Sequence, residues 1–365
     1  MKIKSNCAVL LLAICLAFCG SVLAQEPAPA QSPLPATPKD PNDIFAAAAH
    51  LHDLSAPAVR PWHMKVSYQL YGLDSKPAEQ GTFEYWWVSP KISRSTLMRA
   101  GMEQTTWRVD GKIYRKSSGK SPGFFERNLR KEMLPSLAAL EMQKSGKPVF
   151  EVATEYKEMK GVVCLRRTDG PNPQSPPSDS AVNRSTVYCF AKDHPVLLAE
   201  FNPNGPSVIY QDLTKVQSWI LARKIKVSVE KRTGLIAKVD IVNDISSDAP
   251  ELIPPSDVQT TEQDTDQMKQ SNTAKDISTG ILTRQVPPKY PIVDKANRVG
   301  GTVILAGVIG KDGRVRDIEM LAGPSRSLCE AAAEAVSQWI YRPYTVNGEA
   351  VEIHTTINVV FNLGR

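Results

Sequence analysis

The sequence lacks the strong positive charge that often marks a nucleic-acid-binding protein, and it lacks the common catalytic motifs. Its 44 lysines and arginines exceed its 38 aspartates and glutamates by only 6, so the composition does not indicate a nucleic-acid partner. No serine–histidine–acid order, phosphate-binding glycine loop or paired-carboxylate motif stands out. The five histidines have no cysteine or acidic cluster at metal-ligand spacing. We therefore expect a non-enzymatic protein with no catalytic residues, no metal and no cofactor.

Long apolar runs are also scarce, and the one that approaches a bilayer span lies at the N-terminus. Lys2 and Lys4 precede an unbroken apolar run at residues 8–18, and Ala24 ends a short segment suited to cleavage. This pattern predicts an export signal at residues 1–24, with the mature chain starting at Gln25. The alternative is an uncleaved inner-membrane anchor, because residues 7–24 nearly reach the length of a spanning helix.

Cysteine is rare outside this N-terminal segment, where three of the six cysteines lie. Cys164 and Cys189 fall in two apparent strands joined by a loop rich in proline and serine. In an oxidising compartment a disulfide between them is expected. The alternative is two buried free thiols, and Cys329 has no partner in either case.

Composition divides the rest of the chain into four segments. Residues 25–41 read as a Pro-rich spacer. Residues 42–248 are dominated by strand patterns, with a helix expected at 124–143. Residues 249–279 are polar and read as a flexible linker. Residues 280–365 read as a separate C-terminal domain.

The middle segment contains strands with one apolar and one polar face. Ile225, Val227 and Val229 alternate with polar residues, and the strand after a turn predicted at residues 232–234 continues the apolar face. The fold class is therefore α+β, and its middle domain is an antiparallel curved sheet or half-barrel with helix 124–143 as cover.

The motif G-x-F-x-Y-x-x-x-x-P-K-I-x-R at residues 81–94 resembles the LolA-like lipoprotein carrier superfamily. The resemblance implies an incompletely closed β-barrel whose concave side holds acyl chains, and hence a lipid or lipoprotein ligand. Five aromatic residues could line such a pocket or could be ordinary core residues: Trp62, Tyr85, Trp86, Trp87 and Trp107.

The C-terminal segment has the clearest sequence signals for local structure. A strand follows Gly301, Gly310 to Gly313 form a hairpin turn, and Gly313 is suited to a left-handed conformation. Ser327 and Glu330 fit a capping box at the start of a helix. The helix has one apolar stripe, formed by Leu328, Ala331, Ala332, Ala335, Val336 and Trp339. A long final strand runs from 351 to 363, which completes a small α+β sandwich.

Several motifs in residues 286–364 resemble the TonB C-terminal domain family: Tyr-Pro at 290–291, then G-x-V, D-G-x-V, A-V-x-x-W-x-Y-x-P and a final N-V-V-F-N-L. The resemblance implies a periplasmic domain without catalytic activity that docks on outer-membrane transporters or other envelope proteins. It captures an extended segment of the partner as an added strand. The positions carried over are Tyr290, Pro291, Val351, Glu352, Ile353, His354, Thr355, Thr356, Ile357 and Asn358. For Tyr290 a purely structural role is the alternative.

Two functions follow from these resemblances. The first is an envelope-docking protein with a transport-related energy-transduction or adaptor role. The second is a periplasmic carrier of lipid or lipoprotein that uses the middle domain. The N-terminal apolar run lacks the Ser-x-x-x-His pattern by which energy-coupled members of the family engage their motor, which favours the adaptor role.

Overall fold

The computed structural model describes residues 33–56, 58–137, 150–156, 159–168, 186–202, 205–261, 281–346 and 348–363. Residues 35–365 cluster into one compact unit. The predicted signal peptide at 1–24 and residues 25–32 of the Pro-rich spacer lie outside the described residues. Within the described part, none of the helices combines the length and the apolar character that a membrane span requires.

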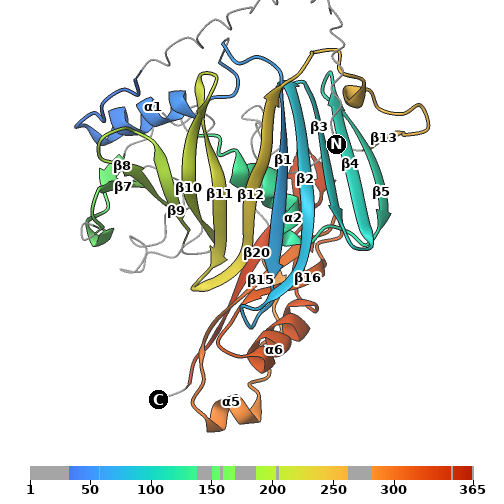
Figure 1. The fold of residues 1–365 in the computed structure, drawn as a ribbon. Coiled ribbons are helices and arrows are strands. Elements are labelled where there is room, and N and C mark those ends of the chain that lie inside the picture. Colours follow the sequence, from blue (N-terminus) through green and yellow to red (C-terminus); the bar gives the residue numbers. More distant parts are fainter. Residues whose placement is uncertain are drawn as a thin grey trace, which may run out of the picture. The chain divides into compact units, whose positions relative to one another are not determined.

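Antiparallel strands make up most of the fold (Figure 1). The strands of the middle domain are β1 (Trp62–Tyr71), β2 (Pro77–Ser89), β3 (Ile92–Arg99), β4 (Met102–Val109), β5 (Lys112–Gly119), β6 (Phe150–Val152), β7 (Val162–Arg167), β8 (Val187–Ala191), β9 (Leu197–Phe201), β10 (Pro206–Val216), β11 (Trp219–Val229), β12 (Arg232–Asp244) and β13 (Thr260–Thr261). They form one 13-stranded sheet in the order β13-β5-β4-β3-β2-β1-β12-β11-β10-β9-β8-β7-β6. The sheet is curved and open, which confirms the predicted antiparallel architecture of this domain (Figure 1).

Two helices cover the apolar face of this sheet. Both α1 (Pro41–Leu51) and α2 (Phe124–Met133) place buried side chains in the same core as β1, β11 and β12. The covering helix is shorter than the predicted 124–143, because it ends at Met133. The cause is Pro135, which disfavours helical dihedrals at Leu134. Residues 138–143, the last part of the predicted helix, lie outside the described part.

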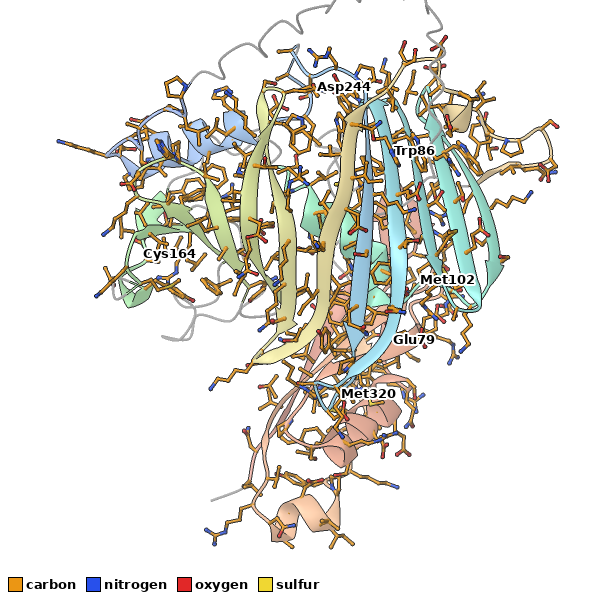
Figure 2. All side chains as sticks on the ribbon, in the orientation of Figure 1. Glu79, Trp86, Met102, Cys164, Asp244 and Met320 are labelled. Carbon is orange, nitrogen blue, oxygen red and sulfur yellow. A yellow bond between two sulfur atoms is a disulfide. The ribbon has the colours of Figure 1, made fainter. Side chains whose placement is uncertain are left out.

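The Cys164–Cys189 disulfide is present, as the sequence predicted. The two cysteines lie directly opposite each other in the β7–β8 pair, toward one end of the sheet (Figure 2). Cys329 is a buried free thiol. A two-residue turn at Asp110 and Gly111 joins β4 to β5, with both residues at positive φ.

The first part of the predicted linker lies on the middle sheet. The 3-10 helix η3 (Pro250–Leu252) follows β12, and β13 pairs with β5. Trp107 Nε1 donates to the carbonyl of Glu251 at 3.0 Å, and Lys116 pairs with Asp257 at 3.1 Å. These contacts fix residues 250–261 on the sheet, although their polar composition alone does not favour an ordered structure. Residues 262–280 lie outside the described part.

The C-terminal domain contains a three-stranded antiparallel sheet in the order β16-β15-β20. Its elements are β14 (Leu282–Arg284), α5 (Ile292–Ala296), β15 (Gly301–Ile309), β16 (Val315–Ala322), α6 (Arg326–Val336), β17 (Ile340–Tyr341), β18 (Tyr344–Val346), β19 (Glu349–Val351) and β20 (Ile353–Phe361). Helix α6 packs on one face of this sheet through the predicted stripe, in which all members but the partly buried Ala331 are buried. The predicted α+β sandwich is therefore confirmed.

The start of α6 differs from the prediction. The N-cap is Ser325, whose hydroxyl accepts from the backbone N–H of Leu328, and the helix begins at Arg326. Glu330 pairs with Arg326 at 2.9 Å instead of closing a capping box with Ser327. Two serines two residues apart offer equivalent caps in the sequence, and the hydroxyl of Ser327 instead donates to Asp294.

Candidate functional site

Strand β20 is the terminal strand of its sheet in the described part of the chain. It pairs with β15 over nine residues, from Ile353 opposite Ile309 to Phe361 opposite Gly301. Ile357, Val359 and Phe361 point into the core under α6. The intervening residues are half-buried or exposed. This alternation buries one side-chain face of β20 in the core. The position of β20 as the terminal strand puts its backbone at the edge of the described sheet.

The predicted docking residues do not all belong to one strand. Val351 ends β19 and pairs with Tyr344 in a short hairpin, and Glu352 lies between β19 and β20. The carboxylate of Glu352 accepts from Arg316 at 2.5 Å. The predicted continuous strand from 351 is therefore divided, because the β18–β19 hairpin takes up Val351. The others, Ile353, His354, Thr355, Thr356, Ile357 and Asn358, follow one another in β20.

Tyr290 and Pro291 lie beside the end of this strand. The Tyr290 hydroxyl donates to the carbonyl of Val299 at 2.7 Å, and its ring meets Phe361 edge-on at 5.4 Å. Pro291 is the N-cap residue of α5. These contacts give Tyr290 a structural role, which was the alternative expected from the sequence.

The five aromatic residues predicted for a lipid pocket do not share one cavity. Trp62, Tyr85 and Trp87 are buried in the core beneath the helices. Trp86 and Trp107 lie outside that core, and the guanidinium of Arg94 stacks over both rings, 4.2 Å from the centroid of Trp86 and 5.7 Å from that of Trp107. Successive side chains of a strand point to opposite faces. The set is therefore split between the two faces of the sheet.

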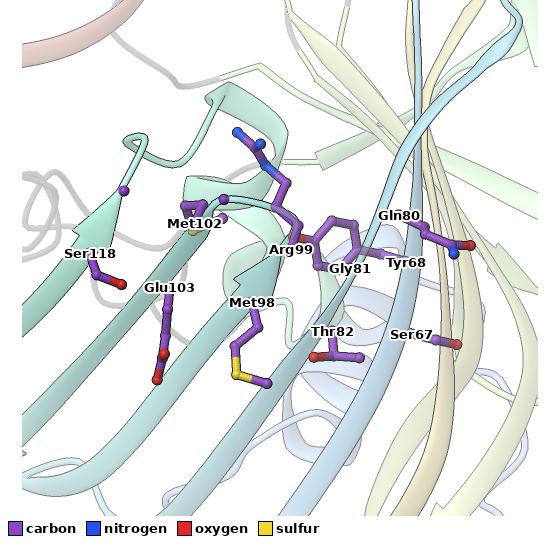
Figure 3. Close-up of a pocket in the computed structure, with 12 residues that line it drawn as sticks. Ser67, Tyr68, Gln80, Gly81, Thr82, Met98, Arg99, Met102, Glu103 and Ser118 are labelled. Atoms are coloured by element: carbon purple, nitrogen blue, oxygen red, sulfur yellow. The ribbon is translucent and has the colours of Figure 1, made fainter.

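The sheet contains a cavity of about 810 Å³ elsewhere, at the ends of β1 to β5 (Figure 3). Its lining forms two neighbouring cross-strand rows: Ser67, Thr82, Met98, Glu103 and Ser118, and then Tyr68, Gly81, Arg99, Met102 and Gly119. Gly81 is required here, since a Cβ would lie 2.4 Å from the hydroxyl of Tyr68. The volume is in the range of small-molecule sites, and two of its polar groups, Tyr68 and Arg99, both bond to Glu126.

The main polar group of this cavity, Arg99, is held by carboxylates. Its guanidinium donates to Glu126 at 2.8 Å and to Glu79 at 2.6 Å. Tyr68 donates to the same Glu126 oxygen at 2.6 Å, while the other oxygen accepts from the backbone N–H of Gly123 at the start of α2. Burial, together with the bond to Glu126, raises the pKa of Tyr68 far above its ordinary value. The network fastens α2 to the sheet and pairs the charge of Arg99 with two carboxylates.

A second buried polar cluster lies near the C-terminal end of α2. Burial raises the pKa of Glu132 to about 7, with a further contribution from nearby Glu200. The carboxylate of Glu200 accepts from Tyr210 at 3.0 Å, and burial raises its pKa as well. His52 is also buried, which lowers its pKa to about 4. Sequence patterns gave no sign of this cluster, because Glu132 follows Arg130 and Lys131 and reads as a residue of the polar face of α2.

Contacts also join α2 to the sheet of the C-terminal domain. The carboxylate of Glu319 on β16 accepts from the backbone N–H of Phe124 at 2.7 Å and from Arg127 at 2.7 Å. Phe124 is the first residue of α2, where the helix dipole favours an anion. Apolar residues surround this contact: Val229, Ile304, Ala306, Leu321, Ala322, Phe124 and Phe125. The strand β15 is therefore buried on both faces, which explains why its residues 303–309 are apolar without alternation.

No group of histidine, cysteine or acidic residues within the described ranges could hold a metal ion. Every predicted site residue lies in the described part of the chain, and most of the docking set falls on β20. The buried carboxylates Glu126 and Glu132 and the partly buried Glu200 were missed by sequence reasoning.

Comparison with known proteins identifies the C-terminal part. Residues 286–363 match the family model of the Gram-negative bacterial TonB protein C-terminal domain. A comparison with curated proteins finds no match.

Solved structures give further similarities. The TonB C-terminal domain of Pseudomonas aeruginosa is 29% identical, covers 26% of this chain and 92% of its own, and has a TM-score of 0.22. A LolA superfamily protein from Nitrosomonas europaea is 7% identical over 57% of this chain and 94% of its own, with a TM-score of 0.35. A DUF1329 family protein from Desulfovibrio piger is 10% identical over 56% of this chain and 93% of its own, with a TM-score of 0.33.

Proposed function

We propose that this protein acts as a periplasmic adaptor whose C-terminal domain docks on an envelope protein, such as an outer-membrane transporter, by strand addition at β20. The observation that carries the proposal is the place of β20 at the end of an antiparallel sheet, as far as the described residues extend, within a segment that matches the TonB C-terminal family. Strand addition draws its affinity from backbone N–H and C=O groups, so a terminal strand is the element it requires.

The chemistry of β20 suits an extended partner. Residues 354, 356 and 358 carry polar side chains on one face, while the opposite face is anchored in the core. Anchoring keeps the strand extended before the partner arrives, which lowers the entropy lost on binding. Because backbone bonds carry the interaction, partners with different sequences can use the same strand.

Proline substitutions test this mechanism. Successive N–H groups of a strand point to opposite edges, so one of Thr355→Pro and Thr356→Pro removes a donor to β15 and the other removes a donor on the far edge. The first variant is expected to lose stability, and the second to stay folded but lose binding of peptides from the periplasmic segments of outer-membrane transporters. Thermal unfolding shows which of the two variants has lost the donor to β15, because that variant melts at a lower temperature. Fluorescence anisotropy measures peptide binding by the other variant.

A cross-linking experiment provides a second readout. A chain that starts at Gln25 and carries Thr356→Cys is mixed with peptides that carry cysteine at successive positions. Strand pairing predicts cross-links at every second peptide position. Equal cross-linking at all positions, or unchanged peptide binding by the folded proline variant, contradicts strand addition.

A carrier role for the middle domain has less support. The aromatic residues expected to line its pocket are divided between the two faces of the sheet. Two polar residues of the cavity at β1 to β5, Tyr68 and Arg99, are both bound to Glu126.

A further inference from the structure

The loop that contains α5 exposes two adjacent aliphatic side chains. Ile292 is 86% exposed and Val293 is 67% exposed. Both are β-branched and therefore contribute little to helix formation, and neither belongs to the core of the domain. Their presence is not explained by the fold. We refer to these two residues, with Lys289, Lys295 and Arg298, as the α5 tip.

The base of this loop is held in place. Tyr290 bonds to the carbonyl of Val299, and the backbone N–H of Val299 donates to the carbonyl of Asp294 at 2.9 Å. The buried carboxylate of Asp294 accepts from the hydroxyl of Ser327 on α6 at 2.5 Å. The two aliphatic side chains are therefore presented to solvent by an ordered loop, since these bonds close its ends.

The charge around the two aliphatic residues has one sign. Residues 286–300 contain Lys289, Lys295 and Arg298, which are all exposed, and a single acid, Asp294. That acid is buried and already bonded, and none of the three cations forms an ion pair with a described residue. The tip therefore combines exposed apolar surface with unneutralised positive charge.

We propose that the α5 tip binds an anionic phospholipid surface, with Ile292 and Val293 entering the headgroup region and the cations meeting lipid phosphates. The affinity of a protein for a membrane surface depends on the insertion of apolar side chains and on the attraction of basic residues to anionic lipids. A second copy of the chain would bring the same cations and be repelled. The anchors of protein interfaces are most often tryptophan, tyrosine or arginine held in pockets, whereas these two side chains are aliphatic and protrude. The inference goes beyond the proposed function, since such contact would hold β20 near a membrane.

The test is vesicle flotation of the full chain and of a chain starting at Gln25, using phosphatidylcholine vesicles with and without phosphatidylglycerol. The shorter chain removes the apolar run at residues 8–18 as a second source of membrane affinity. We expect binding that requires phosphatidylglycerol and weakens with added salt. The double variant Ile292→Ser/Val293→Ser should bind at least about tenfold more weakly, and Lys289→Gln/Lys295→Gln/Arg298→Gln should lose the salt dependence.

Ile281→Ser provides the matched control, because Ile281 is a 47% exposed aliphatic residue that precedes β14. It should bind vesicles as the unmodified chain does, and all variants should keep the same melting temperature. Absence of binding to anionic vesicles, or unchanged binding by the double serine variant, overturns the proposal. A concentration-dependent dimer in analytical ultracentrifugation that the double variant abolishes would assign the tip to a second copy instead. Peptide binding at β20 is measured without vesicles. Failure of the lipid-binding proposal can therefore be distinguished from failure of strand addition at β20.

Discussion

The guanidinium of Arg99 donates to the carboxylate of Glu126 across 2.8 Å, and only 9% and 1% of these two side chains remain exposed. Glu126 also accepts from Tyr68 and from the first turn of α2. One carboxylate therefore joins two strands of the sheet to its covering helix. In a site with so little water, removing one partner leaves the other charge without compensation.

Glu126→Gln should therefore destabilise the protein by about 3 kcal/mol. The amide keeps the shape of the side chain but removes the charge that neutralises Arg99. Urea unfolding at neutral pH measures the loss. Glu79→Gln is the matched control, because Glu79 pairs with the same arginine but its side chain is 49% exposed, and it should cost less than about 1 kcal/mol. Equal losses for the two variants would show that burial does not control this network.

Glu132→Gln should stabilise the protein at high pH and leave it nearly unchanged at low pH. The folded-state pKa of about 7 lies above the ordinary value of 4.5 for a glutamate, so the folded state binds the proton more tightly than the unfolded state. This contribution is fully present below about pH 4.5 and is lost as the pH rises through about 7. A shift of this size corresponds to at most about 3 kcal/mol. Urea unfolding of both proteins at pH 5 and pH 8 measures it, and a pH-independent difference would contradict the assignment.

Gly313→Ala should disrupt the C-terminal domain. Gly313 has a φ of +79°, and a Cβ there would lie 1.9 Å from the carbonyl oxygen of Tyr341. Gly348 has a φ of +86° but open space around it. Gly348→Ala should therefore destabilise the protein only by the cost of a left-handed alanine, about 1 kcal/mol. Amide exchange in β15 and β20 distinguishes the two, because only the first variant should lose protection there. Similar protection in both variants would contradict the predicted clash.

Glu319→Gln should loosen the contact between α2 and the C-terminal sheet. The amide keeps one hydrogen bond but loses the charge that faces Arg127 and the helix N-terminus, at a cost of about 1 to 2 kcal/mol. Amide exchange at Phe124 and Phe125 should become faster. Glu352→Gln serves as control, because its partner Arg316 is on the exposed surface of the same domain. Faster exchange at these two amides in both variants would exclude a local effect of Glu319.

The disulfide between Cys164 and Cys189 should contribute about 3 kcal/mol to stability, given its sequence separation of 25. The double variant Cys164→Ser/Cys189→Ser is expected to melt at a lower temperature than the oxidised protein. Reduction of the unmodified chain should produce a similar loss. The reducing agent should leave the double variant unchanged, and any effect on it would point to a cause other than this bridge.

Local signals predicted the local structure well. The glycines of the 310–313 turn, the helix stripe ending at Trp339 and the alternation around Ile225 each depend on a few neighbouring residues, and each appears as expected. The turn after Val229 is an exception, because it forms at Glu230 and Lys231, two residues before the predicted position. The cysteine pairing could also be inferred, since both residues occupied strands joined by one loop.

Features that depend on distant partners could not be inferred in the same way. The order of residues 250–261 rests on Trp107 and β5, more than 130 residues earlier in the chain. The division of the last strand at Glu352 depends on Tyr344 pairing with Val351. Likewise, Glu126 reads in the sequence as an ordinary charged residue of a helix, and only the approach of Arg99 gives it a structural role.

The position of the disulfide has a consequence for how the sheet is assembled. Cys164 and Cys189 are exact cross-strand neighbours in β7 and β8, close to the β6 end of an open sheet. Strands near such an end are the ones most able to slip along a neighbour, because fewer partners fix their alignment. A covalent link between opposite residues admits only one alignment of this pair. Oxidation during folding would thus select the native register of this strand pair. Misaligned forms, whose exposed edges could pair with other chains, cannot form the bond.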